Sequence, residues 1–516
     1  MRRFISALLT LGIIVMSVSY AFAFTSVKTA ADNTEFAIKT AELINSRNVS
    51  KNQTASVDLL RIIGRAKSSD YKLDRLGASG AVMGADGRFV LQFKDSSSLS
   101  KCLKVLESDP EIIYAEKDRV VYTCASESEE TADLSWGVEA LGVGSYADEI
   151  EYSPDANVTV AIVDSGVAPI DFVKDKLVEG YDFVENESGG AIDESVDSHG
   201  TFLASIVADC VKDAAVSIMP VRVLTSKTGS LINAVNGIYY AADNGADVIN
   251  ISLGGVLNNC KSLDDAVAYA NSNNVSVVVC AGNSKQDIYN YCPAHNECAI
   301  TVSAINSDLE FAADFMSSNS AYGSNFGEEV DVCAPGVNIV GYGADGNLKT
   351  LSGTSMSAAF ISACAALVRL ANPDFTADVV QEKIKESCTD LGAEGFDVYY
   401  GCGLPDMCKI EAYEPVAPYV TGITVKTLPA KTNYMYKIDG NVDLSGLTIE
   451  AIYSDGSTVI VTDTSMMKAS GYSASTAGEQ TVTVEYEGFA IEYTVNVEYT
   501  WWQWIIRILL LGFIWY

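Results

Sequence analysis

The sequence predicts an α/β fold, in which a parallel sheet carries helices on both faces, preceded by a small α+β unit and followed by an all-β module. Between about residues 136 and 413, short apolar segments alternate with helix-like ones, which is typical of strands buried in a parallel sheet. From residue 418 to about 498, apolar and polar residues instead alternate, as in half-exposed strands. A chain of 516 residues is also too long for one compact core, so we expect about three domains.

The first 23 residues have the composition of an export signal. Arg2 and Arg3 precede an uncharged apolar stretch, and residues 21–23, Ala-Phe-Ala, form a small-x-small cleavage pattern. An uncleaved membrane anchor is the alternative, but the cleavage pattern favours removal after Ala23. We therefore expect a secreted protein that works outside the cytoplasm.

Residues 24–125 should form a small unit of strand, helix and strand. Residues 88–94 alternate as a strand does, and residues 111–122 alternate again. Between these segments, three leucines recur at helical spacing: Leu99, Leu103 and Leu106. The polar, acidic stretch "CASESEETADLS" at residues 124–135 is typical of an exposed, cleavable linker.

Residues 133–413 should hold the parallel sheet. We predict its strands at "VTVAIVDSG", "SIMPVRVL", "DVINISLGG" and "VSVVVCAGN". Ligands of such sheets bind beyond the carboxyl ends of the strands. Asp164, residues 252–255 and Asn283 all occupy that position. This edge of the sheet is therefore the expected functional site.

Residues 418–498 should form an all-β module of about the size of one sandwich domain. The stretches "LTIEAIYSDGSTVIVT" and "QTVTVEYEGFAIEYTVNV" both alternate between apolar and polar residues. We expect tight hairpin turns at Asp455–Gly456 and at Glu487–Gly488, and the Asp-Gly pair is the stronger signal.

Residues 501–516, "WWQWIIRILLLGFIWY", form a hydrophobic tail that holds four of the five tryptophans. As a helix the tail would reach roughly 24 Å, which is short of the roughly 30 Å hydrocarbon core of a bilayer. Aromatic residues at both ends suit membrane interfaces. Burial against the protein's own surface is the alternative. We expect a membrane-associating tail, and the sequence leaves open whether it spans the bilayer or lies flat.

The excess of acidic over basic residues limits the classes of partner that the chain can bind. A formal net charge of −33 argues against binding nucleic acid, which needs clustered Lys and Arg. The contents of 48% hydrophobic and 20% charged residues exclude a disordered chain and a protein with many membrane spans.

Twelve cysteines in an exported chain permit disulfides. Cys292 and Cys298 flank "PAHNE" and are the first expected pair, because five intervening residues can close a loop. Cys280 and Cys364 lie in apolar runs, where we expect buried free thiols. The absence of a CxxC pair and the presence of only two histidines make a zinc site improbable.

Three short motifs carry the polar residues of greatest interest: "VAIVDSG" with Asp164, "DSHGTFLA" with His199 and "SGTSMSAA" with Ser355. Each motif alone is weak, because Asp and Ser often cap helices and His before Gly is often a turn residue. Together they supply a nucleophile and its activation. His199 can take the proton of Ser355 as it attacks a carbonyl, while Asp164 holds the imidazole in the right tautomer.

In the chain order Asp, His, Ser, these motifs resemble those of the subtilisin-like serine proteases, the subtilase family. The resemblance covers roughly residues 136–410 and includes "NISLGG" and "VVCAGNS". It implies an endopeptidase that forms an acyl-enzyme on Ser355. It also places Asn283 as an oxyanion donor, through its side-chain amide, together with the Ser355 backbone N–H.

The resemblance also implies where a substrate binds. Ser252, Leu253 and Gly254 resemble the family's edge that pairs with an extended peptide, and Gly229–Ser230 would form the facing edge. A plain strand end with a turn is the alternative for "SLGG", but it does not account for the neighbouring motifs. We expect Thr354 and Ser357 to act as plain helix caps and His295 to be a surface residue. Thr354 and Ser357 lie at the start of the predicted helix, and His295 lies in a polar loop that has no nucleophile motif nearby.

The flanking units take their roles from the same resemblance. Residues 24–125 look like the inhibitory propeptide of these proteases, which assists folding and is removed by the enzyme itself, and "IIYAEKDRVVY" resembles its last strand. Residues 418–498 resemble a bacterial immunoglobulin-like module, which binds or spaces rather than catalyses. The expected partners are polypeptide substrates, the chain's own propeptide and the cell envelope.

Some motifs depart from the family pattern. The family's HGTHVAG run stands here as "HGTFLAS", and the run after Ser355 lacks the usual proline and histidine. Between His199 and "PVRVL" the chain omits the loop that commonly supplies a high-affinity calcium site. We expect no required cofactor and predict no specific metal site. The sequence does not decide whether a weaker calcium site exists elsewhere.

Two other functions compete with a peptidase. A catalytically inactive surface adhesion protein would use the β module for binding, but such a protein has no reason to keep all four polar residues of the site: Asp164, His199, Asn283 and Ser355. A lipase or esterase is expected to show GxSxG and the order Ser, Asp, His, which differs from the order here.

Overall fold

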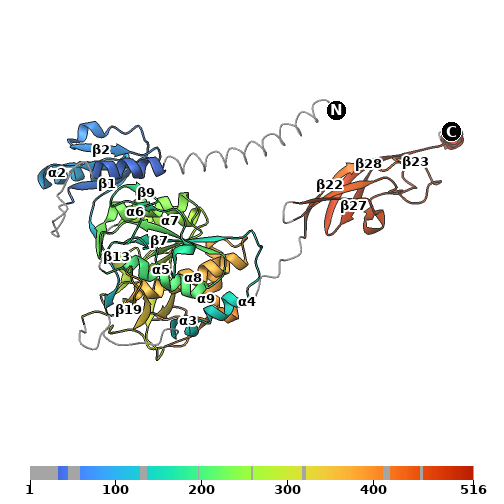
Figure 1. Cartoon of the computed structure of the whole chain (residues 1–516). Coiled ribbons are helices and arrows are strands. Elements are labelled where there is room, and N and C mark those ends of the chain that lie inside the picture. Colours follow the sequence, from blue (N-terminus) through green and yellow to red (C-terminus); the bar gives the residue numbers. More distant parts are fainter. Residues whose placement is uncertain are drawn as a thin grey trace. The chain divides into compact units, whose positions relative to one another are not determined.

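The computed structural model describes residues 33–44, 59–127, 136–195, 197–256, 260–315, 321–410, 419–453 and 457–514, with side chains described as far as residue 510. The chain forms two compact units, Met1–Tyr413 and Glu414–Tyr516, which are labelled by element in Figure 1. The export signal expected at residues 1–23 lies outside the described residues.

A large sheet runs through the first unit. Its strands are parallel except β9, which pairs antiparallel with β8 at one edge. This arrangement confirms the predicted parallel sheet. In spatial order the described strands are β17 (Val332–Pro335), β16 (Ile300–Ile305), β14 (Ser276–Cys280), β12 (Val248–Ile251), β7 (Val158–Asp164), β10 (Val216–Arg222), β8 (Tyr181–Asp182) and β9 (Glu187–Ser188).

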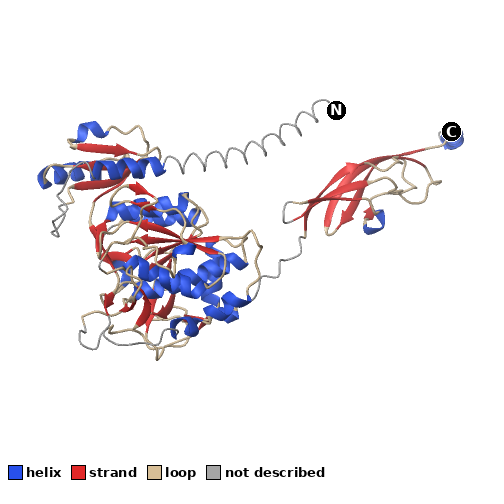
Figure 2. Ribbon diagram, viewed as in Figure 1, coloured by secondary structure: helices blue, strands red, loops and turns tan. Residues whose placement is uncertain are grey.

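Helices cover both faces of this sheet (Figure 2). Val160 and Ile162 of β7 belong to one core, and Ala161 and Val163 belong to the other, because successive strand residues point to opposite faces. All seven residues of β7 are buried as a result. The first core holds α3 (Trp136–Leu141), α4 (Val143–Glu149), α5 (His199–Val211), α8 (Thr354–Ala371) and α9 (Ala377–Glu386). The second core holds α6 (Leu231–Asp243) and α7 (Lys261–Ser272).

The large sheet is preceded by an antiparallel sheet of four described strands with helix α2 packed on it. This sheet and α2 are here called the N-terminal unit. One face packs on α2, with Phe89 and Leu91 against Leu99 and Leu106. The other face and the helical residues 33–44 join the core that holds α6 and α7. The strands, in spatial order, are β2 (Gly80–Met83), β3 (Arg88–Gln92), β1 (Arg61–Ala66) and β4 (Ile112–Lys117), and α2 is Ser96–Ser108.

The single strand predicted over residues 111–122 is wrong, because the segment divides at Asp118. Its first part is β4, and its second part is β5 (Val120–Thr123), which leaves the N-terminal unit for another sheet. Asp118 is buried at this point, where its Oδ2 accepts a hydrogen bond from Arg61 Nε at 2.7 Å and its Oδ1 accepts one from the Ile232 N–H at 3.2 Å. This carboxylate therefore anchors the chain between the two sheets.

Short elements complete the first unit. Strands β11 (Thr228–Ser230), β13 (Leu253–Val256) and β15 (Tyr291–Cys292) form a sheet with β5, and β6 (Ser126–Glu127) joins β18 (Ile339–Tyr342) and β19 (Leu348–Ser352). The remaining pieces are β20 (Cys388–Thr389), β21 (Leu404–Pro405), η1 (Leu73–Leu76), η2 (Lys174–Lys176), η3 (Ile288–Asn290) and η4 (Met407–Lys409).

The second unit is an all-β module, as predicted. Its core lies between two small sheets and includes Ile449, Ala451, Val482, Val484 and Val495. One sheet has the order β22 (Val420–Thr427), β24 (Thr448–Tyr453) and β25 (Thr458–Val461). The other has the order β23 (Asn433–Met435), β28 (Phe489–Glu498), β27 (Gly478–Tyr486) and β26 (Lys468–Ser470), and η5 is Thr464–Met466.

One of the two expected hairpin turns can be seen. Tyr486 pairs with Phe489, and the two residues between them, Glu487 and Gly488, have φ of 48° and 82°. Positive φ at both positions is the signature of a tight two-residue hairpin, which confirms this turn. The turn expected at Asp455–Gly456 lies outside the described residues.

Two apolar helices have opposite surroundings. In the described part of the chain, α8 is the one helix long and apolar enough to cross a membrane, and 94% of it is buried inside the fold. It is therefore the core helix of the first unit. Helix α10 (Trp501–Ile514) is shorter, at 14 residues, and its apolar side chains as far as Leu510 are exposed.

Candidate active site

Asp164 and His199 lie together at the carboxyl edge of the large sheet. Asp164 ends β7, His199 begins α5, and both side chains are buried. The distance from His199 Nδ1 to Asp164 Oδ1 is 2.8 Å, and the same oxygen accepts a hydrogen bond from the Ser165 N–H at 2.7 Å. His199 Nε2 has no hydrogen-bond partner among the described residues. A ring that donates from Nδ1 to the carboxylate keeps Nε2 as its basic atom.

Side chains from outside α5 hold the first turn of this helix. Ser165 Oγ accepts a hydrogen bond from the Gly200 N–H at 2.9 Å, and Asp193 Oδ2 accepts bonds from the N–H and the hydroxyl of Thr201, at 3.1 and 2.8 Å. The first N–H groups of a helix have no partners within the helix itself. These contacts therefore satisfy the helix terminus and fix the position of His199.

The surroundings of His199 make its ring a stronger base than usual. Burial opposes the charged ring, but the negative charge of Asp164 and its hydrogen bond to Nδ1 outweigh burial and raise the pKa of His199 above its ordinary value. The Asp164 carboxylate thereby stabilises the imidazolium that a proton transfer would create.

Ser355 is the second residue of α8, which packs against α5. Its backbone N–H donates to the carbonyl oxygen of Cys124 at 3.3 Å, and its Oγ donates to the carbonyl oxygen of Ser252 at 3.2 Å. Ser355 Oγ is therefore not hydrogen-bonded to His199 Nε2. Proton transfer between these two atoms requires the Ser355 hydroxyl to rotate away from Ser252.

Asn283 is oriented by the first residue of α8. Its Oδ1 accepts hydrogen bonds from the N–H and the hydroxyl of Thr354, at 3.0 and 2.9 Å, and the same hydroxyl accepts a bond from the Gly282 N–H at 3.0 Å. With Oδ1 occupied in this way, the amide Nδ2 faces Gly353, where an added Cβ would lie 2.8 Å from it and would also overlap the Cys124 carbonyl oxygen. Gly353 thus lets an amide donor and a carbonyl oxygen approach the same small space.

Neither of the two expected caps of α8 is a cap. Thr354 orients Asn283, while Ser357 Oγ lies 3.1 and 3.2 Å from the carbonyl oxygens of Ala334 and Pro335. The first-turn N–H groups of α8 are taken by Asn283 Oδ1 and the Cys124 carbonyl instead. The expectation fails because α8 begins at Thr354, so its N-cap position is Gly353 and both residues lie inside the helix.

Residues 120–127, here called the cleft segment, pass through the site. On one side of β5, Val120 and Val121 pair with Ser230 and Gly229 of β11. On the other side, Thr123 and Tyr122 pair with Leu253 and Gly254 of β13, and the Cys124 N–H donates to the Ser252 carbonyl at 3.2 Å. The structure therefore places all five of the predicted substrate-edge residues beside this segment: Gly229, Ser230, Ser252, Leu253 and Gly254.

The cleft segment continues past the site. Ser126 pairs with Ser352, and Glu127 pairs with Leu351. The expectation of an exposed linker is wrong at Cys124, which is buried, and Ser126 and Glu127 lie in a paired strand. Residues 128–135 lie outside the described residues. The Cys124–Ala125 peptide bond lies where the two paired stretches meet, next to Ser355.

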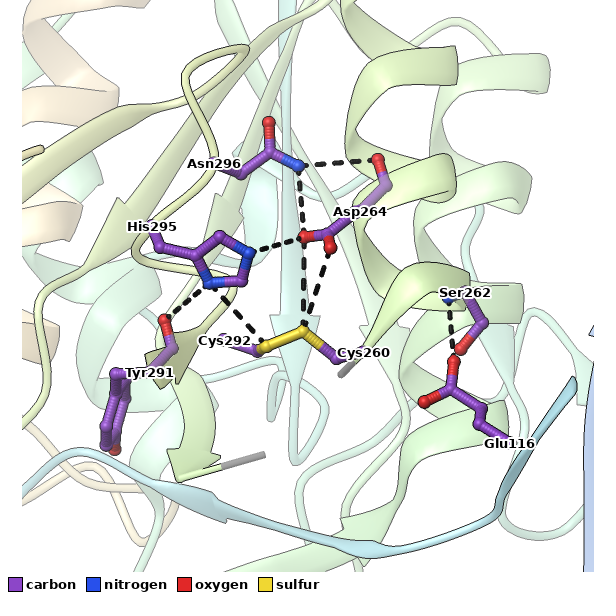
Figure 3. Close-up of a disulfide and its surroundings, with 8 residues drawn as sticks. All are labelled: Glu116, Cys260, Ser262, Asp264, Tyr291, Cys292, His295 and Asn296. Carbon is purple, nitrogen blue, oxygen red and sulfur yellow. Dashed lines mark hydrogen bonds and ion pairs between the residues drawn. A yellow bond between two sulfur atoms is a disulfide. The ribbon is translucent and has the colours of Figure 1, made fainter. Parts of the chain in front are cut away.

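A disulfide braces one wall of the site (Figure 3). It joins Cys260, just before α7, to Cys292 of β15, so the expected pair of Cys292 with Cys298 is wrong. The reason is tertiary: Gly255 of β13 pairs with Cys292, which brings the two chain segments together, whereas Cys298 stays a free thiol. Cys280 and Cys364 are buried free thiols, as predicted.

His295 lies beside this disulfide (Figure 3) and is half-buried rather than a plain surface residue. Its Nε2 is 3.3 Å from Asp264 Oδ1, and its Nδ1 is 3.2 Å from the Tyr291 carbonyl oxygen. Cys260, Cys292 and His295 are grouped closely enough to suggest a metal site, but both sulfurs belong to the disulfide. They are not thiolate ligands in this state.

Comparisons with known proteins match two parts of the chain to known families. The subtilase family model matches residues 155–403, and the model of the bacterial Ig-like domain (group 3) matches residues 427–498. Subtilisin DY of Bacillus licheniformis is 34% identical to the chain over 261 residues, which are 48% of this chain and 89% of that protein.

Two further matches cover similar parts of the chain. Alkaline serine exoprotease A of Vibrio alginolyticus is 34% identical over 294 residues, so the match spans 55% of this chain and 52%, about half, of that relative. The crystal structure of a cold adapted subtilisin-like serine proteinase is 28% identical, with a TM-score of 0.45, and the match covers 53% of this chain and 99% of that one.

Proposed function

Because this chain belongs to the subtilase family of serine-type endopeptidases, we propose that it is an exported zymogen that cleaves its own Cys124–Ala125 bond and then hydrolyses other polypeptides. In this proposal Ser355 is the nucleophile, His199 is the general base and Asp164 orients the imidazole. Asn283 and the Ser355 N–H stabilise the oxyanion.

One observation carries the proposal: the Cys124 carbonyl oxygen accepts a hydrogen bond from the Ser355 N–H. Strand pairing on both sides of Cys124–Ala125 holds the bond in an extended form, as a protease binds a substrate. The carbonyl is thus placed for attack, and Asn283 Nδ2 lies near the position where negative charge would develop.

In the proposed reaction, His199 accepts a proton from Ser355 and later donates it to the leaving nitrogen. The Ser355 hydroxyl attacks the Cys124 carbonyl carbon, and its proton moves to His199 Nε2. The imidazolium passes this proton to the nitrogen of Ala125 as the C–N bond breaks, which leaves Cys124 as an ester of Ser355. Water, activated by the same imidazole, hydrolyses the ester. No cofactor is required for any of these steps.

The N-terminal unit is suited to remain bound as an inhibitor after cleavage. Asp118 Oδ1 accepts from the Ile232 N–H at the start of α6, and Glu116 Oε1 accepts from the Ser262 N–H at 2.8 Å at the start of α7. Carboxylates are favoured at helix N-termini, where the first N–H groups lack partners. These contacts do not depend on the Cys124–Ala125 bond, so cutting that bond leaves them in place.

Export and envelope retention complete the proposal. The signal-like residues 1–23 support export. Helix α10 supports attachment to a membrane surface, because its exposed side chains are almost all apolar or aromatic, with Trp501, Trp502 and Ile508 each about 60% exposed. In this view residues 427–498, the Ig-like domain, act as a spacer or binding module.

Self-processing tests the proposed function. The purified wild-type precursor should convert to a form with Ala125 at its N-terminus, as read by intact mass and N-terminal sequencing. The Ser355→Ala precursor should stay uncut, whereas Ser357→Ala, in the same helix turn, should still be cut. The mature form should also react covalently with a serine-directed phosphonate. Cleavage of pure Ser355→Ala, or a mature form that does not react, would support the inactive adhesion protein instead.

A further inference from the structure

The side chain of Cys124 is buried against Tyr291 in the first unit. Its Sγ lies 3.4 Å from the Tyr291 hydroxyl. Its thiol also lies beside the thiol of Cys280, the last residue of β14. Because Cys124 supplies the carbonyl of the bond to be cut, the space that its side chain occupies, here called the Cys124 pocket, receives the side chain on the amino side of the cleaved bond.

The ring of Tyr291 closes the end of this pocket. Side chains added to the glycines around it would meet the ring: a Cβ at Gly254 would lie 3.0 Å from Tyr291 Cε1, and one at Gly282 would lie 2.5 Å from Cζ. The phenol therefore fills the space that the two glycines leave open. A thiol already touches the Tyr291 hydroxyl, so no depth remains for a longer side chain.

The backbone of Tyr291 is held firmly in place. Tyr291 pairs with Val256 of β13, and the next residue, Cys292, pairs with Gly255 and forms the disulfide to Cys260. The His295 N–H also donates to the Tyr291 carbonyl at 3.2 Å. The ring is buried, and the pairing of β15 with β13 fixes its backbone. Moving the ring to admit a larger side chain would therefore disrupt close packing.

We propose that Tyr291 and Cys280 make this enzyme selective for a small side chain, cysteine above serine and alanine, immediately before the cleaved bond. The inference rests on the proposed function, since it assigns the specificity of the same site. Cys280 and the Tyr291 hydroxyl offer polar contacts to a thiol or hydroxyl, and the ring excludes leucine, phenylalanine and lysine by its volume. Physiological substrates are accordingly polypeptides with small residues at the cleavage point.

A set of quenched fluorescent peptides tests this selectivity with the full-length, self-processed enzyme. The parent peptide has the sequence of residues 120–127, and the Cys124 position is changed to Ser, Ala, Leu, Phe or Lys. We expect kcat/KM for Cys, Ser and Ala to exceed that for Leu, Phe and Lys by at least about tenfold, the scale on which a closed pocket rejects extra methylenes. A preference for Leu or Phe would overturn the proposal.

Variants of Tyr291 separate volume from hydrogen bonding. Tyr291→Gly should raise kcat/KM for the Phe peptide by about tenfold or more, because it opens the end of the pocket. Tyr291→Phe should keep the selectivity for small residues but lower the ratio of Cys to Ala. The matched control is Tyr289→Gly, at an exposed tyrosine two residues away, which should leave the profile unchanged.

The outcomes distinguish this inference from the proposed function. If no peptide is cut and the phosphonate does not label Ser355, the proposed function fails. If the phosphonate labels the enzyme and it prefers large residues, only the specificity inference fails. If Tyr291→Gly does not fold, the wild-type peptide profile still decides, because it needs no variant.

Discussion

The chain contains two histidines, and each hydrogen-bonds an aspartate, yet the regions around them are built differently. His199 uses Nδ1 for Asp164 and has no partner for Nε2 among the described residues. His295 uses both ring nitrogens, Nε2 toward Asp264 and Nδ1 toward the Tyr291 carbonyl. A histidine–aspartate pair therefore does not make a base by itself. The difference is that Nε2 of His199 has no partner among the described residues, whereas both ring nitrogens of His295 are engaged.

The two regions also differ in what their neighbours do. Around His199, the ends of β7, α5 and α8 present polar groups to the cleft segment. Around His295, the disulfide and the pairing of β13 with β15 hold Tyr291 in place. The first region holds the groups that we propose to react, and the second holds the tyrosine that we propose to limit the substrate side chain.

Removing each histidine should give the largest contrast. His199→Ala should slow self-cleavage of the precursor by about 10⁴-fold or more, because the general base is lost. The precursor with His295→Ala should cleave itself at a rate near that of the wild-type precursor. The measurement is the appearance of the Ala125 N-terminus over time. Equal rates for the two variants would contradict the assignment of His199 as the base.

Removing the disulfide should weaken the wall without removing a reacting group. The bond links residues 32 positions apart, so replacing Cys260 and Cys292 by Ser should lower the free energy of unfolding by about 3 to 4 kcal/mol in the chain-entropy model. Chemical denaturation of the first unit in a Ser355→Ala background measures this, since that background prevents self-digestion. Cys298→Ser is the control, and an equal loss of stability in it would argue against the Cys260–Cys292 pairing.

Two asparagines provide the third contrast. Asn283→Ala should lower kcat by about 10² to 10³-fold with little change in KM, because its amide acts on the oxyanion rather than on the bound substrate. Asn296 donates to Asp264 Oδ1 at 3.2 Å in the His295 region, so Asn296→Ala should leave kcat nearly unchanged. Steady-state kinetics on the Cys peptide compares them. A drop confined to KM in Asn283→Ala would be inconsistent with an oxyanion donor.

The pH dependence gives the smallest effect. The neutral ring of His199 is the active form, so activity should rise with pH through a pKa above the ordinary value of 6.5, because Asp164 outweighs the cost of burial. Below that pKa, kcat/KM should fall about tenfold per pH unit. The hydrogen bond that His295 donates to Asp264 also raises the pKa of His295, but His295→Ala should give the same profile. A profile that is flat from pH 5 to 8 would exclude His199 as the base.

The residue types of the site could be predicted from the sequence. Asp164, at the end of a run of seven buried strand residues, and Ser355, at the start of an apolar helix, lie in local patterns that show where a parallel sheet opens. Helix and strand periods depend on near neighbours in the chain, so α2, β7 and the hairpin at Glu487–Gly488 were also foreseeable.

Other features have no local signal. The disulfide partner of Cys292 depends on the pairing of β15 with β13, and the split at Asp118 depends on Arg61 and on the start of α6. The contact of Tyr291 with Cys124 has no local signal either, because nothing in "IYNYCPAH" distinguishes this tyrosine from its exposed neighbour Tyr289.

The sequence by itself determined the class of fold and the family, and it located the residues that we propose as the reacting groups, because each of these depends on short segments of adjacent residues. Only the tertiary structure decided which carbonyl accepts the Ser355 N–H and which side chain contacts Cys124. Cys124 and Tyr291 are 167 positions apart in the chain, and they meet because separate strands pair around one cleft. Such contacts follow from strand register and packing over the whole unit, which no short segment encodes.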